Sequence, residues 1–513
     1  MTVSSRSLQS PTPLLWASGD PAASIPPGTI VASRFRVAHQ RVWHDLQPAQ
    51  LPLAPVPLPK DLQCYARAYE QNLHLPQIYD ICLLETGDRV VLLDNPPLDA
   101  RGELLPSLQA AWPKATALRQ LNWLWQMLEL WPLLAALGVA DSLLQFDNVR
   151  VADGRVRLLE LLPATGAATQ KQLGIVWATL APKARPAISP QLSFIAAQLQ
   201  RSQAERDSAI ASLNSLLLAA TARQPRTWEV SVLTDTGRFP RHNQDSCYPL
   251  GHFRSDAASP NELQATDSIL VCDGIGGHDG GEIASQLAVQ SLKLQIDKLL
   301  VETARNPSAQ MPTAIARQIA TTVRVTNNSI VARNNAQNRH ARSRMATTLV
   351  MAVQVKQHLA EDGNPAHEVY LAHVGDSRAY WLTARRCCQL TVDDDMATQY
   401  ILNSRLLPRT AIQRVRLRAL SQAIGIADAS GLRPTVRRLI VDEDGLLLLC
   451  SDGLSDYQFL EESWHEFAPA VLRDELSLAS ATRLAMKLAN DRNGHDNITL
   501  AIARYRLGPR RRI

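Results

Sequence analysis

Five aspartates mark places where short apolar runs of the chain end or begin, mostly beside Gly or Asn. They are Asp245, Asp273, Asp376, Asp452 and Asp496. One aspartate in such a setting caps a turn. Five carboxylates gathered at one end of a sheet would repel one another unless a cation neutralised them. An all-oxygen set without paired histidines or cysteines favours Mg²⁺ or Mn²⁺, and two such ions can activate a water and clamp a phosphoryl group.

The stretch around Asp273 has the most distinctive pattern. Residues 269–272 form an apolar run of strand length, which suits a strand buried on both faces. Five glycines follow within nine residues, and a helix is expected from about Glu282. One carboxylate thus stands at the mouth of a buried strand with bare backbone beside it. Hard metal ions accept both carboxylate and carbonyl oxygens, whereas the alternative for this site alone is a turn cap.

Composition excludes several classes of function. The 513 residues include 53 basic and 48 acidic ones, a net charge of +5, so no strong field for polyanions arises and nucleic acid is not expected as a partner. Seven cysteines without CxxC spacing indicate reduced thiols in a cytoplasmic protein. We expect no secretory signal and no transmembrane segment, because the most apolar stretch, residues 123–140, contains Gln126, Glu129 and Pro132.

The chain divides by composition into five parts. Residues 1–60 are rich in Pro and Ser and predict a connecting segment, with one strand or hairpin at 28–37. Residues 61–165 predict a mixed α/β accessory domain, 166–226 a helical spacer, 227–508 a second globular domain and 509–513 a basic tail. In the second domain, helices are expected at about 282–300, 312–335 and 478–490.

In the accessory domain, the sequence predicts a strand at 89–93, one or two helices at 112–137 with a break near Pro132, and a hairpin at 149–162. This order resembles a degenerate protein kinase, with residues 146–149 and 156–160 where a catalytic loop and its following strand would stand. The glycine-rich loop, His-Arg-Asp and Asp-Phe-Gly sequences that serve ATP and magnesium in kinases are missing. The alternatives are a non-catalytic kinase-like regulatory domain and an unrelated helical domain.

Four motifs together carry a more specific resemblance. They are Asp273-Gly-Ile-Gly-Gly-His, Gly375-Asp-Ser-Arg, Ser451-Asp-Gly-Leu-Ser-Asp and Gly494-His-Asp-Asn. In this order they resemble the metal-dependent type 2C serine/threonine protein phosphatases, in particular their bacterial branch, over about residues 228–506. The resemblance implies an α+β fold, an αββα sandwich of two antiparallel sheets flanked by helices, with metals in a cleft at one end. The accessory domain would precede it.

The resemblance also implies roles for individual residues. Asp273 would bridge two Mn²⁺ or Mg²⁺ ions, one of them also held by the Gly274 carbonyl, and Asp452 and Asp496 would hold the other. These three aspartates are the expected catalytic set. Asp376, with Asp452 or Asp456, would hold a third, weaker ion. Further residues with implied positions are Asp245 in the first motif, Thr347 and Thr348 at a Gly-Thr-Thr position, Arg378 as an ion-pair partner, and residues 393–418 as a flap that influences substrate choice.

The first motif departs from the family pattern Arg-x-x-Asn-Glu-Asp. Pro240 stands at the position of the phosphate-binding arginine, and Gln244 at that of the glutamate that serves the second metal. Arg238 or Arg241 would have to supply the guanidinium, and Gln244 predicts weaker binding of the second metal. The histidine of the flap entry is also lost, since residues 390–395 read Leu-Thr-Val-Asp-Asp-Asp. For His278 and His495, an acid-base role and a loop role are both open.

The predicted function is metal-dependent hydrolysis of phosphoserine and phosphothreonine in protein substrates by a metal-bridged water, with a regulatory N-terminal region that has a protein partner of its own. The alternative is a pseudophosphatase that binds metal or phosphoprotein without turnover. A third reading is a scaffold whose function lies in the N-terminal half. The aspartates favour activity, whereas Pro240 and Gln244 favour the pseudophosphatase.

Overall fold

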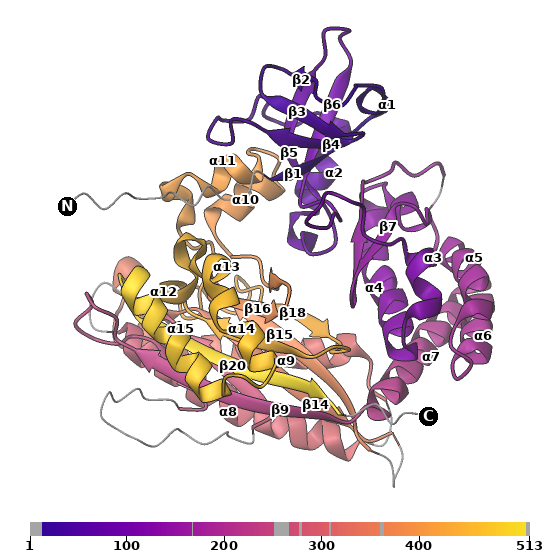
Figure 1. The fold of residues 1–513 in the computed structure, drawn as a ribbon. Coiled ribbons are helices and arrows are strands. Elements are labelled where there is room, and N and C mark those ends of the chain that lie inside the picture. The colour runs from indigo at the N-terminus through magenta and orange to yellow at the C-terminus, as the bar shows by residue number, and fades with distance from the viewer. Residues whose placement is uncertain are drawn as a thin grey trace. The chain divides into compact units, whose positions relative to one another are not determined.

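The computed structural model describes residues 13–166, 168–250, 266–275, 280–306, 309–359 and 364–508. The chain forms two compact units (Figure 1). The first comprises Met1–Ile210 together with Met396–Ala419, and the second comprises Ala211–Asp395 together with Leu420–Ile513. A segment of the C-terminal half is therefore part of the N-terminal unit.

The first unit contains an antiparallel sheet of six strands in the order β2-β3-β4-β1-β6-β5. The strands are β1 (Leu14–Ser18), β2 (Ile30–Val31), β3 (Phe35–His39), β4 (Val42–Asp45), β5 (Gln77–Leu83) and β6 (Arg89–Asp94). Leu15, Phe35 and Trp43 pack with residues of β5 and β6 in one core. The expectation that residues 1–60 form a separate connector is therefore wrong, because their apolar residues complete a sheet whose other strands come later. The hairpin expected at 28–37 is present as β2 and β3.

Helices and a hairpin make up the rest of the N-terminal part. The helices are α1 (Asp20–Ala23), α2 (Gln63–Arg67), α3 (Leu108–Ala111), α4 (Ala117–Ala136), α5 (Gln170–Leu180) and α6 (Ser189–Leu199). Helix α4 runs through Pro132, so the predicted break is absent; apolar residues on both sides of the proline, such as Leu128 and Leu134, are buried and hold the helix in place. The hairpin of β7 (Val149–Ala152) and β8 (Arg155–Leu158) turns at Asp153 and Gly154, as predicted.

The predicted spacer is helical but does not act as a separate part. Helices α5 and α6 belong to the first unit, and α7 (Gln203–Ala222) crosses the division between residues 210 and 211. Near the hairpin, the Glu160 carboxylate accepts hydrogen bonds from Trp16 Nε1 at 2.6 Å and Ser18 Oγ at 2.7 Å. Glu160 thus ties the end of the hairpin to β1. The kinase-like interpretation of this part stays a prediction.

The second unit has two antiparallel sheets of five strands each. One has the order β10-β11-β14-β15-β18 and the other β17-β16-β19-β20-β9. The first contains β10 (Ser246–Tyr248), β11 (Ser268–Cys272), β14 (Leu349–Gln357), β15 (Ala366–Val374) and β18 (Thr435–Leu439). The second contains β17 (Cys387–Gln389), β16 (Arg378–Leu382), β19 (Gly445–Cys450), β20 (Ile498–Leu507) and β9 (Arg226–Asp235). Strands β12 (Gly274–Ile275) and β13 (Ala346–Thr347) form a short separate pair.

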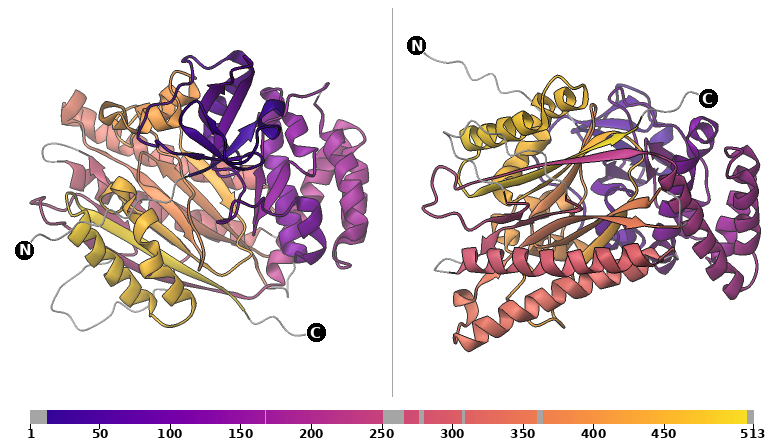
Figure 2. Two further views of the ribbon diagram at one scale, coloured as in Figure 1. Left: turned by 45° about the horizontal axis from the view of Figure 1, so that its top comes forward. Right: turned by 90° about the horizontal axis from the view of Figure 1, so that it is seen from below.

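Helices cover the outer faces of both sheets, so the unit has four layers (Figure 2). Helices α8 (Gly281–Arg305) and α9 (Pro312–Ala336) pack Leu292 and Ile319 onto the first sheet. The second sheet is covered by α12 (Asp452–Ser455), α13 (Phe459–Ser463), α14 (Ala468–Leu472) and α15 (Leu478–Arg492). The predicted αββα sandwich is confirmed, as are the helices expected at 282–300, 312–335 and 478–490.

The segment expected to be a flap forms helices α10 (Met396–Leu402) and α11 (Pro408–Ile412). It leaves the second unit at Asp395 and returns at Leu420, where these two residues form an antiparallel bridge. Among the described residues, no helix is both long and apolar enough to cross a membrane. All seven cysteines are free thiols.

Candidate metal centre

Asp273 follows the buried strand β11, and two threonines hold its backbone. Thr347 Oγ1 and the Thr348 N–H donate to the Asp273 carbonyl, both at 2.8 Å. Thr348 Oγ1 accepts the Asp273 N–H at 3.0 Å. Because β12 and β13 pair immediately afterwards, the chain cannot swing away from this point. The backbone of Asp273 is therefore fixed at the end of β11.

Backbone segments meet closely beside Asp273. A Cβ on Gly274 would lie 2.5 Å from the Gln244 carbonyl oxygen, and one on Gly281 would lie 2.6 Å from the Gly274 carbonyl oxygen and 3.0 Å from Gln244 Nε2. Only glycine allows this approach. The structure thus places the Gln244 side chain and the Gly274 carbonyl together at the start of α8.

Asp452 begins α12, separated from the end of β19 by Ser451, and Asp496 is separated from the start of β20 by Asn497. Asn497 connects this region to the first motif. Its Oδ1 accepts the Gln244 N–H at 2.8 Å, and its Nδ2 donates to the carbonyls of Thr236 at 2.8 Å and His242 at 3.0 Å. One amide side chain therefore positions the loop 236–244 against the strand that follows Asp496.

Asp376 lies in a turn that opens with Gly375 at φ +98°. This is the left-handed region that glycine favours. The Asp394 carboxylate accepts the Gly375 N–H at 2.9 Å, and the Asp394 N–H donates to the Gly375 carbonyl at 2.9 Å. Ser377 Oγ lies 2.7 Å from Thr348 Oγ1. The loops that carry Asp376 and Asp273 are thus joined through Thr348.

Arg378 follows two residues later and forms an ion pair, as expected. Its guanidinium meets the Asp393 carboxylate through two nitrogens, with Nε to Oδ1 at 3.0 Å and Nη2 to Oδ2 at 2.7 Å. It also donates to the Ser455 carbonyl at 3.2 Å. Arg378 is therefore occupied in holding two loops together.

Asp245 is buried, with 8% of its surface exposed. Ser451 Oγ donates to its Oδ2 at 2.8 Å. The same Ser451 oxygen accepts the Thr499 N–H at 3.0 Å. Ser451, which precedes Asp452, therefore positions Asp245 from the second sheet.

Burial and mutual repulsion raise the pKa of four of these carboxyl groups. The pKa rises to about 6 at Asp245, about 7 at Asp452 and about 8 at Asp376, and that of Asp273 lies well above its usual range. Burial is the largest cause in each case. The next cause at Asp273 is the charge of Asp452, and at Asp452 it is the charge of Asp496. All five predicted aspartates therefore belong to one electrostatic cluster.

The cluster fits a cation in its chemistry. Asp245 Oδ1 and Asp452 Oδ1 are buried without a hydrogen-bond partner, and the donors are carboxylate and carbonyl oxygens, which hard divalent ions prefer. Within the described part of the chain, no group of three or more His, Cys, Asp or Glu side chains is arranged to hold a metal ion. What the site provides is charge and unpaired carboxylate oxygens.

The two candidate phosphate-binding arginines lie in different settings. The Arg238 guanidinium forms an ion pair with Asp491, and the Arg238 backbone N–H donates to the Gly494 carbonyl at 3.2 Å. Arg238 lines a cavity of about 360 Å³ together with Tyr457, Asn490, Arg492 and His495. Arg241 is exposed.

The predicted ligand Asp456 faces His495 in this region. His495 Nε2 lies 3.4 Å from Asp456 Oδ2, and its Nδ1 lies 2.5 Å from the Asn493 carbonyl oxygen. Its ring also meets Tyr457 edge-on. These contacts fit a loop role for His495, whereas His278 lies outside the described residues.

Sequence reasoning assigned no role to Asn497 or Ser451, although both stand inside quoted motifs. Each adjoins an aspartate that was singled out, and that adjacency was the available signal. Their roles depend on partners more than 200 residues away in sequence, namely Gln244 and Asp245. Such partners are visible only once the two sheets are assembled.

Comparison with known proteins finds phosphatases that are similar to the second half of the chain. Residues 243–490 match the family model of protein phosphatase 2C. This part of the chain is therefore similar to the protein phosphatase 2C family. The serine/threonine phosphatase Stp of Listeria welshimeri is 29% identical over 276 residues, which cover 53% of this chain and 94% of that protein. Protein phosphatase PhpP of Streptococcus pneumoniae is 28% identical over 274 residues, covering 53% and 96%.

Among solved structures, the serine/threonine phosphatase Stp1 of Staphylococcus aureus is similar over 54% of this chain and 95% of its own, with 24% identity and a TM-score of 0.42. The matches with Stp and PhpP each span about half of the present chain and almost all of the relative. The residues that match the family model, 243–490, lie in the second unit except for 396–419, which belong to the first.

Proposed function

We propose that the phosphatase 2C domain hydrolyses phosphoserine and phosphothreonine esters in proteins with the help of bound Mn²⁺ or Mg²⁺. The observation that supports this most is the cluster of five aspartates, four with raised pKa values and two with buried, unpaired oxygens. Such a cluster is costly for an unliganded protein. In a phosphatase 2C domain, bound metal ions would offset the repulsion among these carboxylates.

The chain's own residues have distinct tasks in this proposal. Asp273, with the Gly274 carbonyl, Asp452 and Asp496 would hold two ions, and Asp376 with Asp452 or Asp456 a weaker third. When bound, the ions would lower the pKa of a water between them and neutralise charge on the phosphoryl group. Thr347 and Thr348 fix the backbone of Asp273, which keeps the carboxylate in place when the charge near it changes.

The substrate phosphate carries about −1.5 to −2 charges at neutral pH. Because Pro240 replaces the family's arginine, the guanidinium must come from elsewhere, and Arg238 is the better-placed candidate. It lies beside the Asp496 loop, since its N–H bonds the Gly494 carbonyl, and it lines the cavity described above. Arg241 remains the second candidate.

Gln244 favours a less tightly bound second metal. Its amide lies beside Gly274 and Gly281, at the position where the family has a carboxylate. A neutral amide oxygen attracts a cation, or its water, less strongly than a carboxylate. We therefore expect an enzyme with a high metal requirement, and the pseudophosphatase is the second candidate function because Pro240 and Gln244 are both altered.

The remaining proposals concern the setting of the protein. Seven cysteines without a disulfide fit the reducing cytoplasm. Phosphoproteins are the proposed substrates, and the N-terminal unit is proposed to regulate the phosphatase domain and to bind a protein partner.

The experiment that tests the proposed function is phosphate release from a phosphothreonine peptide by the full chain, with Mn²⁺ titrated from zero. Asp452→Asn is measured in parallel, with Asp428→Asn as a control of equal charge change in an exposed loop. Turnover that rises with Mn²⁺, is lost in Asp452→Asn and is kept in Asp428→Asn supports the enzyme. Folded protein without turnover at millimolar Mn²⁺ contradicts it and leaves the pseudophosphatase.

A further inference from the structure

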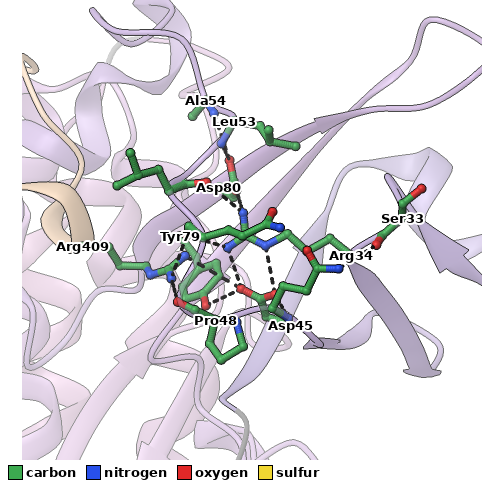
Figure 3. A network of polar contacts seen from close by, with 12 residues as sticks. Ser33, Arg34, Asp45, Pro48, Leu53, Ala54, Tyr79, Asp80 and Arg409 are labelled. Carbon is green, nitrogen blue, oxygen red and sulfur yellow. Dashed lines mark hydrogen bonds and ion pairs between the residues drawn. The ribbon is translucent and has the colours of Figure 1, made fainter.

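The first unit buries an ionic network on its sheet (Figure 3). Arg34, Asp45 and Asp80 expose 2%, 0% and 0% of their surface. Arg34 Nε donates to Asp45 Oδ1 at 2.9 Å and Nη2 to Asp45 Oδ2 at 2.7 Å, while Nη1 reaches Asp80 Oδ2 at 3.3 Å. Two buried carboxylates thus share one buried guanidinium. Such a set is short of one positive charge, and an uncompensated buried charge is strongly destabilising.

The second positive charge comes from Arg409, in helix α11 of the C-terminal half. Its Nη1 lies 3.9 Å from Asp45 Oδ2, and its guanidinium stacks 4.0 Å from the centre of the Tyr79 ring. Its Nη2 donates to the carbonyls of Pro48 and Gln50, the latter at 3.3 Å. Figure 3 shows Arg409 entering the network from the side opposite Arg34. A planar guanidinium can stack and donate to carbonyls at the same time, which lysine cannot do.

An apolar contact supports the same attachment. Ala397, Ile401, Leu406 and Ala411 form a small buried cluster within the segment, and Tyr69 of the N-terminal part packs against it. The segment 396–419 is therefore held by the N-terminal unit through two separate contacts, one polar and one apolar. Both are formed by residues more than 300 positions apart in sequence.

The ends of this segment are attached to the candidate metal centre. Asp394 forms two hydrogen bonds of 2.9 Å with Gly375, the residue before Asp376. The Ser421 N–H donates to the Asp394 carbonyl at 2.8 Å, and Ile424 exchanges two backbone hydrogen bonds with Thr347 at 2.9 and 3.0 Å. The residues that flank the segment on both sides are thus bonded to the loops that carry Asp376 and Asp273.

We propose that the N-terminal sheet is an intramolecular docking surface for residues 396–419, anchored by Arg409, and that this docking determines how the phosphatase domain binds phosphoprotein substrates. The proposal rests on the proposed phosphatase function and specifies its regulation. A ligand or partner that displaced Arg409 from Asp45 and Tyr79 would free the segment at its centre while its ends stayed bonded beside the metal centre. Substrate binding, more than the reaction at the metals, would then change.

The test uses the full chain and four variants. Arg409→Ala removes the polar anchor, Arg409→Lys keeps its charge, and Tyr69→Ala removes the apolar contact from the other partner. Arg414→Ala is the matched control, because Arg414 is an exposed arginine of the same segment. Hydrogen exchange of the amides in 396–419 reports docking without any need for activity. Fluorescence anisotropy with a labelled phosphothreonine peptide reports substrate binding without any need for turnover.

We expect Arg409→Ala and Tyr69→Ala to speed exchange in 396–419 and to change the peptide Kd about threefold or more, as couplings of this kind commonly do. Arg409→Lys should give a smaller change, and Arg414→Ala none. Turnover of p-nitrophenyl phosphate, which has no peptide to bind, should stay within about twofold of wild type in all four, a change of about 0.4 kcal/mol or less.

Equal exchange in Arg409→Ala, Arg414→Ala and wild type would overturn the docking. Faster exchange with an unchanged peptide Kd would overturn its control of substrate binding. If wild-type protein released no phosphate from either substrate, the proposed catalytic function would fail, while exchange and peptide binding would still decide this inference.

Discussion

Replacing Asp452 by Asn is predicted to stabilise the metal-free protein while abolishing its response to metal. Asp452 is surrounded by like charges, with Asp496, Asp456 and Asp245 among the causes of its raised pKa after burial. Asparagine has nearly the same shape and no charge. The substitution should therefore relieve repulsion in the apo protein and remove a proposed ligand at the same time, so that stability and function move in opposite directions.

The magnitude follows from the pKa of Asp452, which rises from 3.8 to about 7. Holding the ionised form at pH 8 then costs about 4 kcal/mol, at about 1.4 kcal/mol per pKa unit. The repulsion is shared among several carboxylates, and some of it relaxes through solvent, so we expect the substitution to recover about half, or about 2 kcal/mol. For a unit of this size that corresponds to about 4–8 °C in the midpoint of thermal unfolding.

The effect should depend on pH. An acid with a raised folded-state pKa destabilises the protein wherever the unfolded state is the more ionised, so the cost is absent below about pH 4, grows as the pH rises to about 7 and is constant above that. The gain from Asp452→Asn should thus be largest at pH 8, less than half as large at about pH 5, and absent below about pH 4. Thermal unfolding in EDTA at pH 5 and pH 8, followed by circular dichroism, measures this, and saturating Mn²⁺ should raise the midpoint of wild type alone.

Asp428→Asn is the control, because it should change the stability of the protein in the opposite direction. Hydrogen bonds from Ser430 and from the Gly431 and Ser430 backbone lower the pKa of Asp428, so its replacement should slightly destabilise the protein at pH 8. The reasoning would be refuted if Asp452→Asn lowered stability in EDTA at pH 8. It would equally be refuted if the gain were the same at pH 5 and pH 8.

Three further predictions concern neighbouring residues. Gln244→Glu should lower the Mn²⁺ concentration at half-maximal activity by about fivefold, since a charged acceptor is worth about 1 kcal/mol more than a neutral one; an unchanged titration would place Gln244 away from the metals. Gly274→Ala should cost about 1–3 kcal/mol in thermal unfolding by overpacking, whereas Gly166→Ala, whose added methyl would meet nothing within 4 Å, should be neutral. Asn497→Ala should cost about 3 kcal/mol for its three hydrogen bonds, and a midpoint equal to wild type would contradict its connecting role.

The phosphatase domain could be predicted from sequence because its signals are local. Each aspartate follows or precedes an apolar run, mostly beside glycine or asparagine, so strand ends and site residues appear together. The sandwich and its long helices are confirmed for the same reason: α8, α9 and α15 have apolar periodicity that identifies them without knowledge of their partners.

The N-terminal half was predicted less well because its structure depends on distant partners. The segment at 51–59 reads as a proline-rich connector, yet Leu53 and Ala54 donate their N–H groups to the buried Asp80 at 2.7 and 2.9 Å. Strand β1 pairs with β6 across more than 70 residues. The role of Arg409 could not be predicted from the sequence, because nothing near it in sequence distinguishes it from any exposed arginine. Its partners, Asp45 and Tyr79, become apparent only in the folded structure.

Both units bury several carboxylates close together, but they balance the negative charge in different ways. In the first unit, two buried carboxylates, Asp45 and Asp80, meet two guanidiniums, Arg34 and Arg409, so the charges are matched within the chain. In the second, the guanidinium that lowers the pKa of Asp376 belongs to Arg378, which is held by Asp393. Within the described residues, the aspartate cluster therefore has more carboxyl groups than the arginine side chains described above can pair. A buried excess of this kind persists in a folded protein when a cation from solution completes it, which is why we expect metal to raise the stability of wild type and leave Asp452→Asn unchanged.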